Sequence, residues 1–208
     1  MKHGVYSVAG GKGGVGKTTT TLNLATTLGE FGATVVVVEL DLGMANVVDF
    51  LDLDCDLTAV PTLHDVLADE TSVFEALRNE PAGFDLLPSG VTLEGFANVD
   101  VTRMEWVLEA LRSTYDVILL DTGAGISQET VFPLKIADEV VLVTTPRSAA
   151  VRDTRKTRNL ARSAGTDVRG VVFTRRKRSS SLSISCTRCD CSRAGESWRR
   201  CARRVVSP

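Results

Sequence analysis

The chain has 208 residues, of which 43% are hydrophobic and 5% aromatic, a composition typical of a globular domain rather than of a disordered or fibrous chain. Its apolar runs are short, as at 35–38, whereas a membrane-spanning helix needs about 20 apolar residues. The first residues also lack the pattern of a secretion signal. These features exclude an integral membrane protein and predict a cytoplasmic one.

The net charge of −2 averages two parts of opposite charge. Residues 1–174 contain 14 basic and 24 acidic side chains, whereas residues 175–208 contain 10 basic and 2 acidic ones. The second part also has a Ser-rich run and four of the five cysteines, at Cys186, Cys189, Cys191 and Cys201. We therefore expect one folded domain over 1–174, followed by a basic Ser/Arg/Cys-rich tail that is disordered or the product of a shifted reading frame. One alternative is a zinc site in the tail, although paired Cys-x-x-Cys modules are missing. The other is that the basic run with Trp198 binds nucleic acid or an acidic membrane surface.

Within residues 1–174, short apolar segments alternate with segments of helical spacing. The predicted strands are 5–9, 33–40, 84–87, 115–121, 139–145 and 168–174. The predicted helices are 18–31, 63–67, 72–77, 101–113, 127–137 and 149–164. The segment at 33–40 is too continuously apolar to alternate, as expected for a strand covered on both faces. The order of the elements predicts a three-layer α/β/α fold with a mainly parallel sheet and right-handed crossovers.

A glycine-rich loop follows the first predicted strand and runs from Gly10 to Thr18. It fits two phosphate-binding patterns at once, G-x-G-x-x-G and G-x-x-x-x-G-K-[ST]. The first pattern predicts a dinucleotide, with Glu39 at the end of the next strand binding the ribose. The second predicts a nucleoside triphosphate held by backbone N–H groups, with Lys17 on the β and γ oxygens and Thr18 on Mg²⁺.

Two features favour the triphosphate. The adjacent Lys17 and Thr18 are not required by the dinucleotide pattern, yet a metal-bound phosphate chain needs both. The predicted strand at 115–121 also ends in Asp121, which is followed by Gly123. A carboxylate in this position gives Mg²⁺ an oxygen ligand, directly or through water, and the glycine lets a backbone N–H approach the γ-phosphate.

Lys12 is a second lysine within the loop, and the segment 12–19 resembles the deviant Walker A motif of the MinD/ParA family of dimerising ATPases. Residues 41–46 resemble the switch I segment of that family, and residues 121–125 resemble its Walker B and switch II segment. Residues 144–146 and 151–153 resemble the loop and helix after the next strand. The resemblance covers 5–174, is closest to the MinD-like branch and implies a P-loop NTPase fold.

The resemblance implies that ATP and Mg²⁺ bind, that two protomers meet across the nucleotides, and that the γ-phosphate is slowly hydrolysed. Lys12 would reach the partner's phosphates, which ties turnover to association. The expected catalytic residues are Lys12, Lys17 and Asp41, and the expected metal ligands are Thr18, Asp41 and Asp121. The expected nucleotide contacts are Gly11, Lys12, Gly13, Gly14, Val15, Gly16, Lys17, Thr18, Thr19 and Gly123.

The chain departs from the family pattern after its second strand. The family usually places two aspartates there, separated by one residue, whereas this chain has Glu39 and Asp41. Asp41 is expected to position water and support the metal shell, with a helix cap or turn as its alternative role. Glu39 has a longer side chain, so its contact is expected to shift. Asn46 is expected to help to hold the partner or the phosphate end.

Members of the resembled family normally continue past the strand at 168–174. The later segments usually complete the adenine pocket, and MinD-like proteins often end in a membrane-binding helix. Neither is recognisable in 175–208, so the domain is expected to lack its C-terminal part. Arg175 falls where the family often places a side chain that contacts the base.

The expected function is an ATPase that acts as a spatial switch in placing the cell-division site, with a regulatory or cargo protein as its partner. Peripheral membrane association is an expectation for the full-length family. Chromosome or plasmid partition is the first alternative. A basic DNA-binding surface in residues 1–174 would favour it, whereas the acidic balance of these residues argues against it, and they show no direct sign of nucleic-acid binding. The others are a truncated module that binds nucleotide without hydrolysing it, and a hydride-transfer enzyme.

Overall fold

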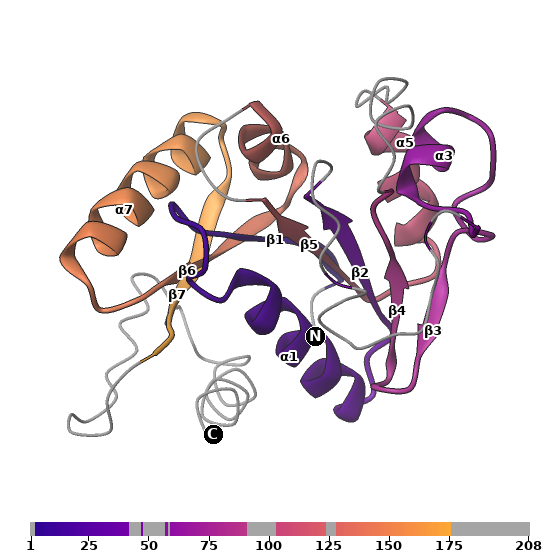
Figure 1. Cartoon of the computed structure of the whole chain (residues 1–208), viewed down its shortest axis with the longest axis horizontal. Helices are drawn as coiled ribbons and strands as arrows, with labels where there is room; N and C mark the ends of the chain where they lie inside the picture. The colour runs from indigo at the N-terminus through magenta and orange to yellow at the C-terminus, as the bar shows by residue number, and fades with distance from the viewer. Residues whose placement is uncertain are drawn as a thin grey trace.

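The computed structural model describes residues 3–41, 47, 57, 59–90, 103–123 and 128–175. Its centre is a seven-stranded sheet in the order β3-β4-β2-β5-β1-β6-β7 (Figure 1). The strands are β1 (Gly4–Ala9), β2 (Val35–Leu40), β3 (Arg78–Glu80), β4 (Phe84–Leu87), β5 (Val117–Thr122), β6 (Glu139–Thr144) and β7 (Asp167–Phe173). Neighbouring strands are parallel except β3, which runs antiparallel to β4. The carboxyl ends of the parallel strands therefore meet at one edge of the sheet.

Helices cover both faces of the sheet and give the molecule three layers (Figure 1). They are α1 (Lys17–Glu30), α3 (Leu63–Leu67), α5 (Met104–Arg112), α6 (Gln128–Ile136) and α7 (Ser148–Ser163). Helix α1 packs on one face, and α3, α5, α6 and α7 pack on the other. Strands β1, β2 and β5 are buried along their whole length, as expected between two helical layers. None of the helices in the described part of the chain is long and apolar enough to cross a membrane.

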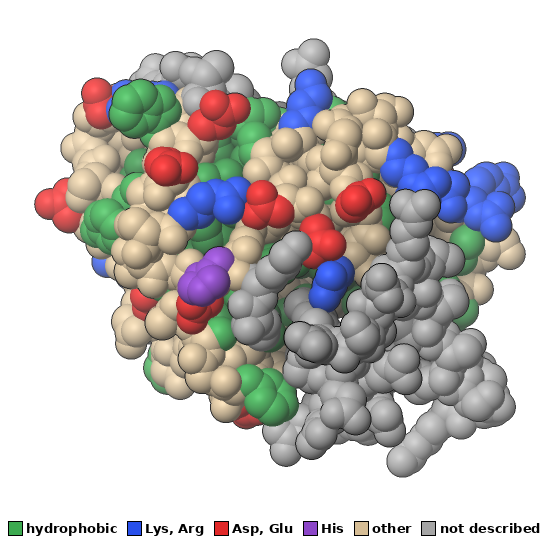
Figure 2. All heavy atoms as spheres, turned by 180° about the vertical axis from the view of Figure 1, so that it is seen from behind, with side chains coloured by type: hydrophobic (Ala, Val, Ile, Leu, Met, Phe, Trp, Pro, Cys, Tyr) green, Lys and Arg blue, Asp and Glu red, His purple; other side chains and the backbone are tan. Residues whose placement is uncertain are grey.

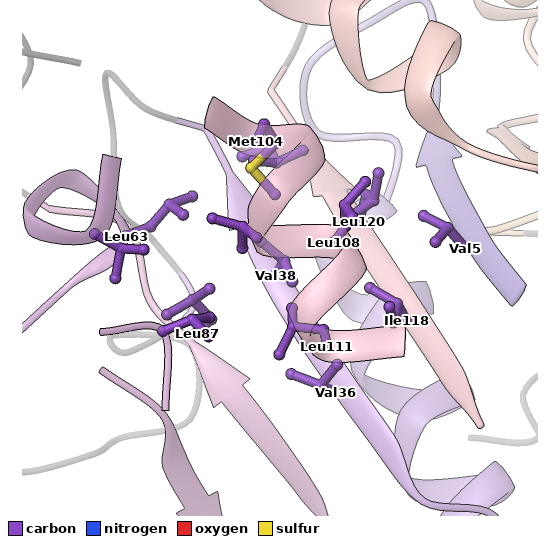
Figure 3. Close-up of a cluster of buried hydrophobic side chains, with 14 of the residues drawn as sticks. Val5, Val36, Val38, Leu63, Leu87, Met104, Leu108, Leu111, Ile118 and Leu120 are labelled. Carbon is purple, nitrogen blue, oxygen red and sulfur yellow. The ribbon is translucent and has the colours of Figure 1, made fainter. Parts of the chain in front are cut away.

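The largest buried cluster lies between α5 and the sheet (Figure 3). Alternate strand residues point into it, and α5 contributes side chains that lie three or four positions apart. Its fully buried members include Val36, Val38, Leu108, Leu111, Ile118 and Leu120. Each large apolar side chain buried in this way stabilises the fold by about 1.5–3 kcal/mol. The cluster therefore holds β2 and β5 rigidly, and the polar residues at the ends of these strands are positioned by it.

The predicted three-layer fold is confirmed. The elements at 63–67 and 84–87 have the predicted bounds, the others have shifted ends, β3 was not predicted, and 72–77 differs. That segment was predicted to be a helix, which is wrong, because it forms a turn that leads into β3. Ser72 and Glu75 make the hydrogen bonds of a helix start, with the Ser72 hydroxyl 2.8 Å from Glu75 Oε2. Pairing of β3 with β4 then replaces helical bonding. The predicted tail from residue 176 onward, including its cysteines, lies outside the described residues.

Basic side chains gather on α7 and the strand that follows it. Residues 147–174 contain 7 basic and 2 acidic side chains, whereas residues 1–146 contain 7 basic and 22 acidic ones. The exposed basic residues of α7 and its N-cap are Arg147, Arg152, Arg155, Lys156 and Arg162. Figure 2 shows Lys and Arg side chains gathered at the side of the molecule that carries α7. The acidic balance of residues 1–174 therefore conceals a basic surface on one helix.

Candidate functional site

Three segments that are far apart in the sequence meet at the carboxyl edge of the sheet. The glycine loop, residues 10–16, joins β1 to α1, while Asp41 follows β2 and Asp121 lies near the end of β5. Because β5 lies between β1 and β2, Asp121 is in register with Val8 on one side and with Glu39 on the other. Ligands of open α/β sheets bind in the crevice outside the carboxyl ends of the strands. The fold thus brings the predicted phosphate loop and the predicted metal-binding carboxylates to one place.

Two glycines determine the shape of the loop. Gly16 is the N-cap of α1 and has φ 93° and ψ 34°, in the left-handed region that favours glycine. At Gly11, a Cβ atom would lie 2.3 Å from the carbonyl carbon of Asp153, so the loop backbone packs directly on the backbone of α7. The loop and the first turn of α1 offer backbone N–H groups at a helix N-terminus, which is an arrangement that binds phosphate.

Lys17 is the first residue of α1, and only 8% of it is exposed. Burial lowers the pKa of its ammonium group, whereas the carboxylates of Asp121 and Asp41 act in the opposite direction. The buried cation thus lies beside the loop amides with carboxylates near it. A phosphate chain in the loop would give it further oxygen acceptors, which makes Lys17 well placed for a charge-assisted hydrogen bond to phosphate.

Asp121 is held by two threonine hydroxyls of α1. Thr18 Oγ1 donates to Asp121 Oδ2 at 2.7 Å, and Thr21 Oγ1 donates to Asp121 Oδ1 at 2.9 Å. Burial raises the pKa of the Asp121 carboxyl to about 6; the two hydroxyls and Lys17 oppose that shift, and Asp41 adds to it. A carboxylate whose charge is costly in this way is stabilised by an added cation.

The oxygen atoms at this edge fit Mg²⁺. Asp41 Cγ lies 3.2 Å from the place that a Cβ on Gly123 would occupy, so the Asp41 carboxylate lies against the backbone that follows β5. Thr18, Asp41 and Asp121 together supply hydroxyl and carboxylate oxygens, the ligand type that Mg²⁺ prefers. The described residues contain no group of three or more His, Cys, Asp or Glu side chains that could hold a metal by themselves. Mg²⁺ typically takes its remaining ligands from substrate phosphates and water.

Comparison with known proteins supports the nucleotide interpretation. The family model described as an AAA domain matches residues 3–162. An uncharacterised ATP-binding protein of Methanocaldococcus jannaschii is 36% identical over 170 residues, which are 81% of this chain and 63% of that protein. The septum site-determining protein MinD of Pyrococcus horikoshii, solved with Mg-ADP, has a TM-score of 0.77 and 31% identity over 100% of this chain and 78% of that one. The chain belongs to the MinD/ParA family of P-loop ATPases.

Other members of this family carry different names. The antiactivator FleN of Pseudomonas aeruginosa is 32% identical over 152 residues, which are 72% of this chain and 53% of that protein. The chain spans just under two thirds of the M. jannaschii relative and about half of FleN. Membership of the MinD/ParA family therefore gives the fold and the nucleotide-binding loop, whereas the biological role of this chain is a separate question.

Several of the remaining predicted site residues of this MinD/ParA domain lie on the loop. Lys12, Gly13, Gly14 and Thr19 are exposed, and Val15 is buried against Val8 and Val143. Gly123 directly follows β5 and lies against Asp41. Arg175 follows β7 by two residues and has φ 53°. Asn46 lies outside the described residues.

Glu39 occupies the position at which the MinD/ParA pattern usually has its first aspartate. Its surroundings indicate a role in holding the fold together. Its side chain is fully buried and accepts backbone N–H groups from Val47, at 2.9 Å, and from Ser89, at 3.1 Å. The longer side chain was expected to change its contact, and its carboxylate binds the backbone of two separate segments, at Val47 and at Ser89. A ribose contact, as in the dinucleotide interpretation, would require breaking these bonds inside the core.

Two residues of the site were not predicted from the sequence. Thr21 binds Asp121 from α1, and its position three residues after Thr18, on the same face of the helix, is a signal that could have indicated it. Thr174 follows β7 and donates its hydroxyl to Val15 of the loop at 2.5 Å. No local pattern marks Thr174, because the contact joins residues 159 positions apart.

Proposed function

We propose that this protein binds ATP with Mg²⁺, dimerises when ATP is bound, hydrolyses the γ-phosphate slowly, and acts as a spatial switch in placing the cell-division site. The single observation that carries the proposal is the 2.7 Å hydrogen bond from Thr18 Oγ1 to Asp121 Oδ2. It joins the residue after the loop lysine to the strand-end carboxylate, which are the two groups that P-loop NTPases use to hold Mg²⁺. The likeness to a MinD protein solved with Mg-ADP supports the same conclusion.

In the proposed site, the loop amides and Lys17 bind the β- and γ-phosphates. Thr18, Asp41 and Asp121 would hold Mg²⁺, which supplies positive charge for the oxygens of the transferred phosphoryl group. Asp41 orients the attacking water from the end of β2. Lys12 is exposed on the loop, so its ammonium group is free of the core and available to the phosphates of a second protomer.

Phosphate release from Mg-ATP tests turnover. The wild-type chain is expected to release phosphate slowly, and Asp41→Ala to lose most of this activity while it still binds nucleotide. Binding without release in both proteins would leave a nucleotide-binding module without turnover. Absence of magnesium-dependent binding by calorimetry in the folded wild type would contradict the proposal altogether.

ATP-dependent dimerisation is tested separately through Lys12. Lys12→Ala is expected to retain binding of ATP to the monomer and to lose the ATP-dependent dimer, measured by light scattering after size-exclusion chromatography. Lys135→Ala, which removes an exposed lysine from the last turn of α6, is the matched control. Equal dimerisation of the two variants would refute the role of Lys12.

One observation favours a second candidate, a partition ATPase that moves DNA. The exposed basic side chains of α7 form a stripe at Arg152, Arg155, Lys156 and Arg162, and such a stripe attracts phosphate backbones. DNA binding that falls steeply with salt, and that is lost in an Arg152→Glu/Arg155→Glu variant, would favour this candidate. If the protein does not bind DNA, the partition role is ruled out and the division-site role remains.

A further inference from the structure

Thr174 links β7, the last strand in the described sheet, to the phosphate loop. It directly follows β7, and its backbone N–H donates to the carbonyl of Thr144, at the end of β6, at 2.8 Å. Its hydroxyl donates to the carbonyl of Val15 at 2.5 Å, with the Thr144 carbonyl farther away, at 3.3 Å. The backbone of Thr174 is thus fixed on β6, while its side chain reaches across to the loop.

The contact with Val15 sets the direction of one peptide group. In a trans peptide the carbonyl and the following N–H point in opposite directions. Since the Val15 carbonyl is turned toward Thr174, the N–H of Gly16 points away from β7. Gly16 is the left-handed N-cap of α1, and a backbone N–H at such a position contributes to an anion-binding concavity.

The methyl group of Thr174 contacts the same part of the loop. A Cβ atom built on Gly16 would lie 3.3 Å from Thr174 Cγ2, so the two residues pack closely and a larger loop residue would require Thr174 to shift. The hydroxyl holds one end of the Val15–Gly16 peptide, and the methyl group packs beside the other. Rotation of this peptide would break the hydrogen bond between the Thr174 hydroxyl and the Val15 carbonyl.

We propose that Thr174 is a positioning residue for phosphate binding, because its hydroxyl holds the Val15–Gly16 peptide in the orientation that directs the Gly16 N–H toward the triphosphate. The inference rests on the proposed function and adds a residue to that site. It also makes nucleotide affinity depend on β7, which among the described strands pairs only with β6. Thr174 acts through the loop and touches no reacting atom.

Binding of Mg-ATP to the full chain, measured by calorimetry, tests the proposal. Thr174→Val removes the hydroxyl and keeps the shape, and it is expected to weaken binding by about 2- to 12-fold, the worth of one hydrogen bond. Thr174→Ser keeps the hydroxyl and should bind within about 2-fold of the wild type. Thr166→Val is the matched control, because the Thr166 hydroxyl donates to the carbonyl of Leu134 at 2.6 Å just before β7 and far from the loop.

Competition with inorganic triphosphate, which has no base, shows whether Thr174 acts on the phosphate loop or on the part of the site that binds the adenine base. Thr174→Val should weaken binding of triphosphate by the same factor as binding of ATP, since the loop binds phosphates only. Loss of ATP affinity with unchanged triphosphate affinity would overturn the proposal. If the valine variant does not fold, Thr174→Ala, which adds no bulk, is expected to show the same loss in both measurements.

The outcomes distinguish this inference from the proposed function. If the folded wild type does not bind Mg-ATP, the proposed function fails. If the wild type binds and Thr174→Val binds equally well, or if Thr166→Val loses as much affinity as Thr174→Val, only the positioning role of Thr174 fails.

Discussion

One aspartate lies just before strand β5 and another lies near its carboxyl end, and the two carboxyl groups have opposite environments. Asp116, just before the strand, accepts the Thr34 N–H at 2.8 Å and the Thr34 hydroxyl at 3.0 Å, and these bonds lower its pKa. Asp121, at the other end, is buried, and burial raises its pKa to about 6. The fold therefore stabilises one carboxylate as an anion and makes the charge of the other costly.

The same contrast holds for the neighbours of these two residues. At the amino edge, Arg112 makes two 3.0 Å bonds to Asp138, and the Tyr115 hydroxyl donates to Asp85. At the carboxyl edge, Asp41 adds a like charge to the surroundings of Asp121. The contacts of the amino edge stabilise charged carboxylates, whereas the proposed function assigns to the carboxyl edge a ligand that brings cationic charge and phosphate oxygens.

The largest expected effect comes from removing the buried cation of the carboxyl edge. Lys17→Ala should weaken Mg-ATP binding by about 100-fold, because a charge-assisted contact to phosphate is lost and the Asp121 and Asp41 carboxylates lose their nearest countercharge. Calorimetry with Mg-ATP measures the loss. Lys135→Ala, with an exposed lysine on α6, should bind as the wild type does, and equal affinities in both variants would remove Lys17 from the site.

The two aspartates of β5 should respond to neutralisation with opposite signs. Asp121 has a raised pKa, so its contribution to stability is full below 3.8 and is lost as the pH rises through about 6. Asp121→Asn avoids that loss, and at pH 7 the nucleotide-free variant should be more stable than the wild type by about 1–3 kcal/mol. The Thr18 and Thr21 hydroxyls can turn to meet the amide group.

Asp116 should behave in the reverse way. Its pKa is lowered, so its contribution is present above 3.8 and is lost as the pH falls. Asp116→Asn should therefore lower the melting temperature at pH 7, and the difference from the wild type should shrink toward pH 3. Thermal unfolding of both variants between pH 3 and pH 8, without nucleotide, checks the comparison. If Asp121→Asn is less stable than the wild type at pH 7, neighbouring groups already stabilise the charge of Asp121 in the absence of nucleotide.

The sequence predicted the carboxyl side of this contrast and not the amino side, for physical reasons. The loop from Gly11 to Thr18 and the strand ending in Asp121 were predicted because local patterns mark both of them. The role of Glu39 as an acceptor for Val47 and Ser89 depends on how β2 and β4 end side by side, which only the folded sheet shows. The turn at 72–77 carries a genuine helix-start signal, and the pairing of β3 overrides it.

A smaller effect is expected where the loop meets α7. Gly11→Ala would place a methyl group 2.3 Å from the Asp153 carbonyl carbon, so backbone must move, at a cost of about 1–3 kcal/mol. The displaced loop should also bind Mg-ATP more weakly. Gly170→Ala is the matched control, because a Cβ there meets nothing within 4 Å and no left-handed torsion is involved. Unchanged stability and affinity in Gly11→Ala would show that the loop and α7 are not packed as described.

The smallest effect is expected at the amino edge. Tyr115→Phe removes the hydroxyl that donates to Asp85 and leaves that carboxylate with the Asn79 amide at 2.8 Å, so the fold should lose about 1 kcal/mol. Thermal unfolding should show a decrease of about 2–4 °C in melting temperature for a chain of this size. Affinity for Mg-ATP should not change, because Tyr115 precedes β5 and Asp121 lies near its other end. A loss of affinity in Tyr115→Phe would mean that the two edges of the sheet are coupled, and the division between a stabilising edge and a binding edge would not hold.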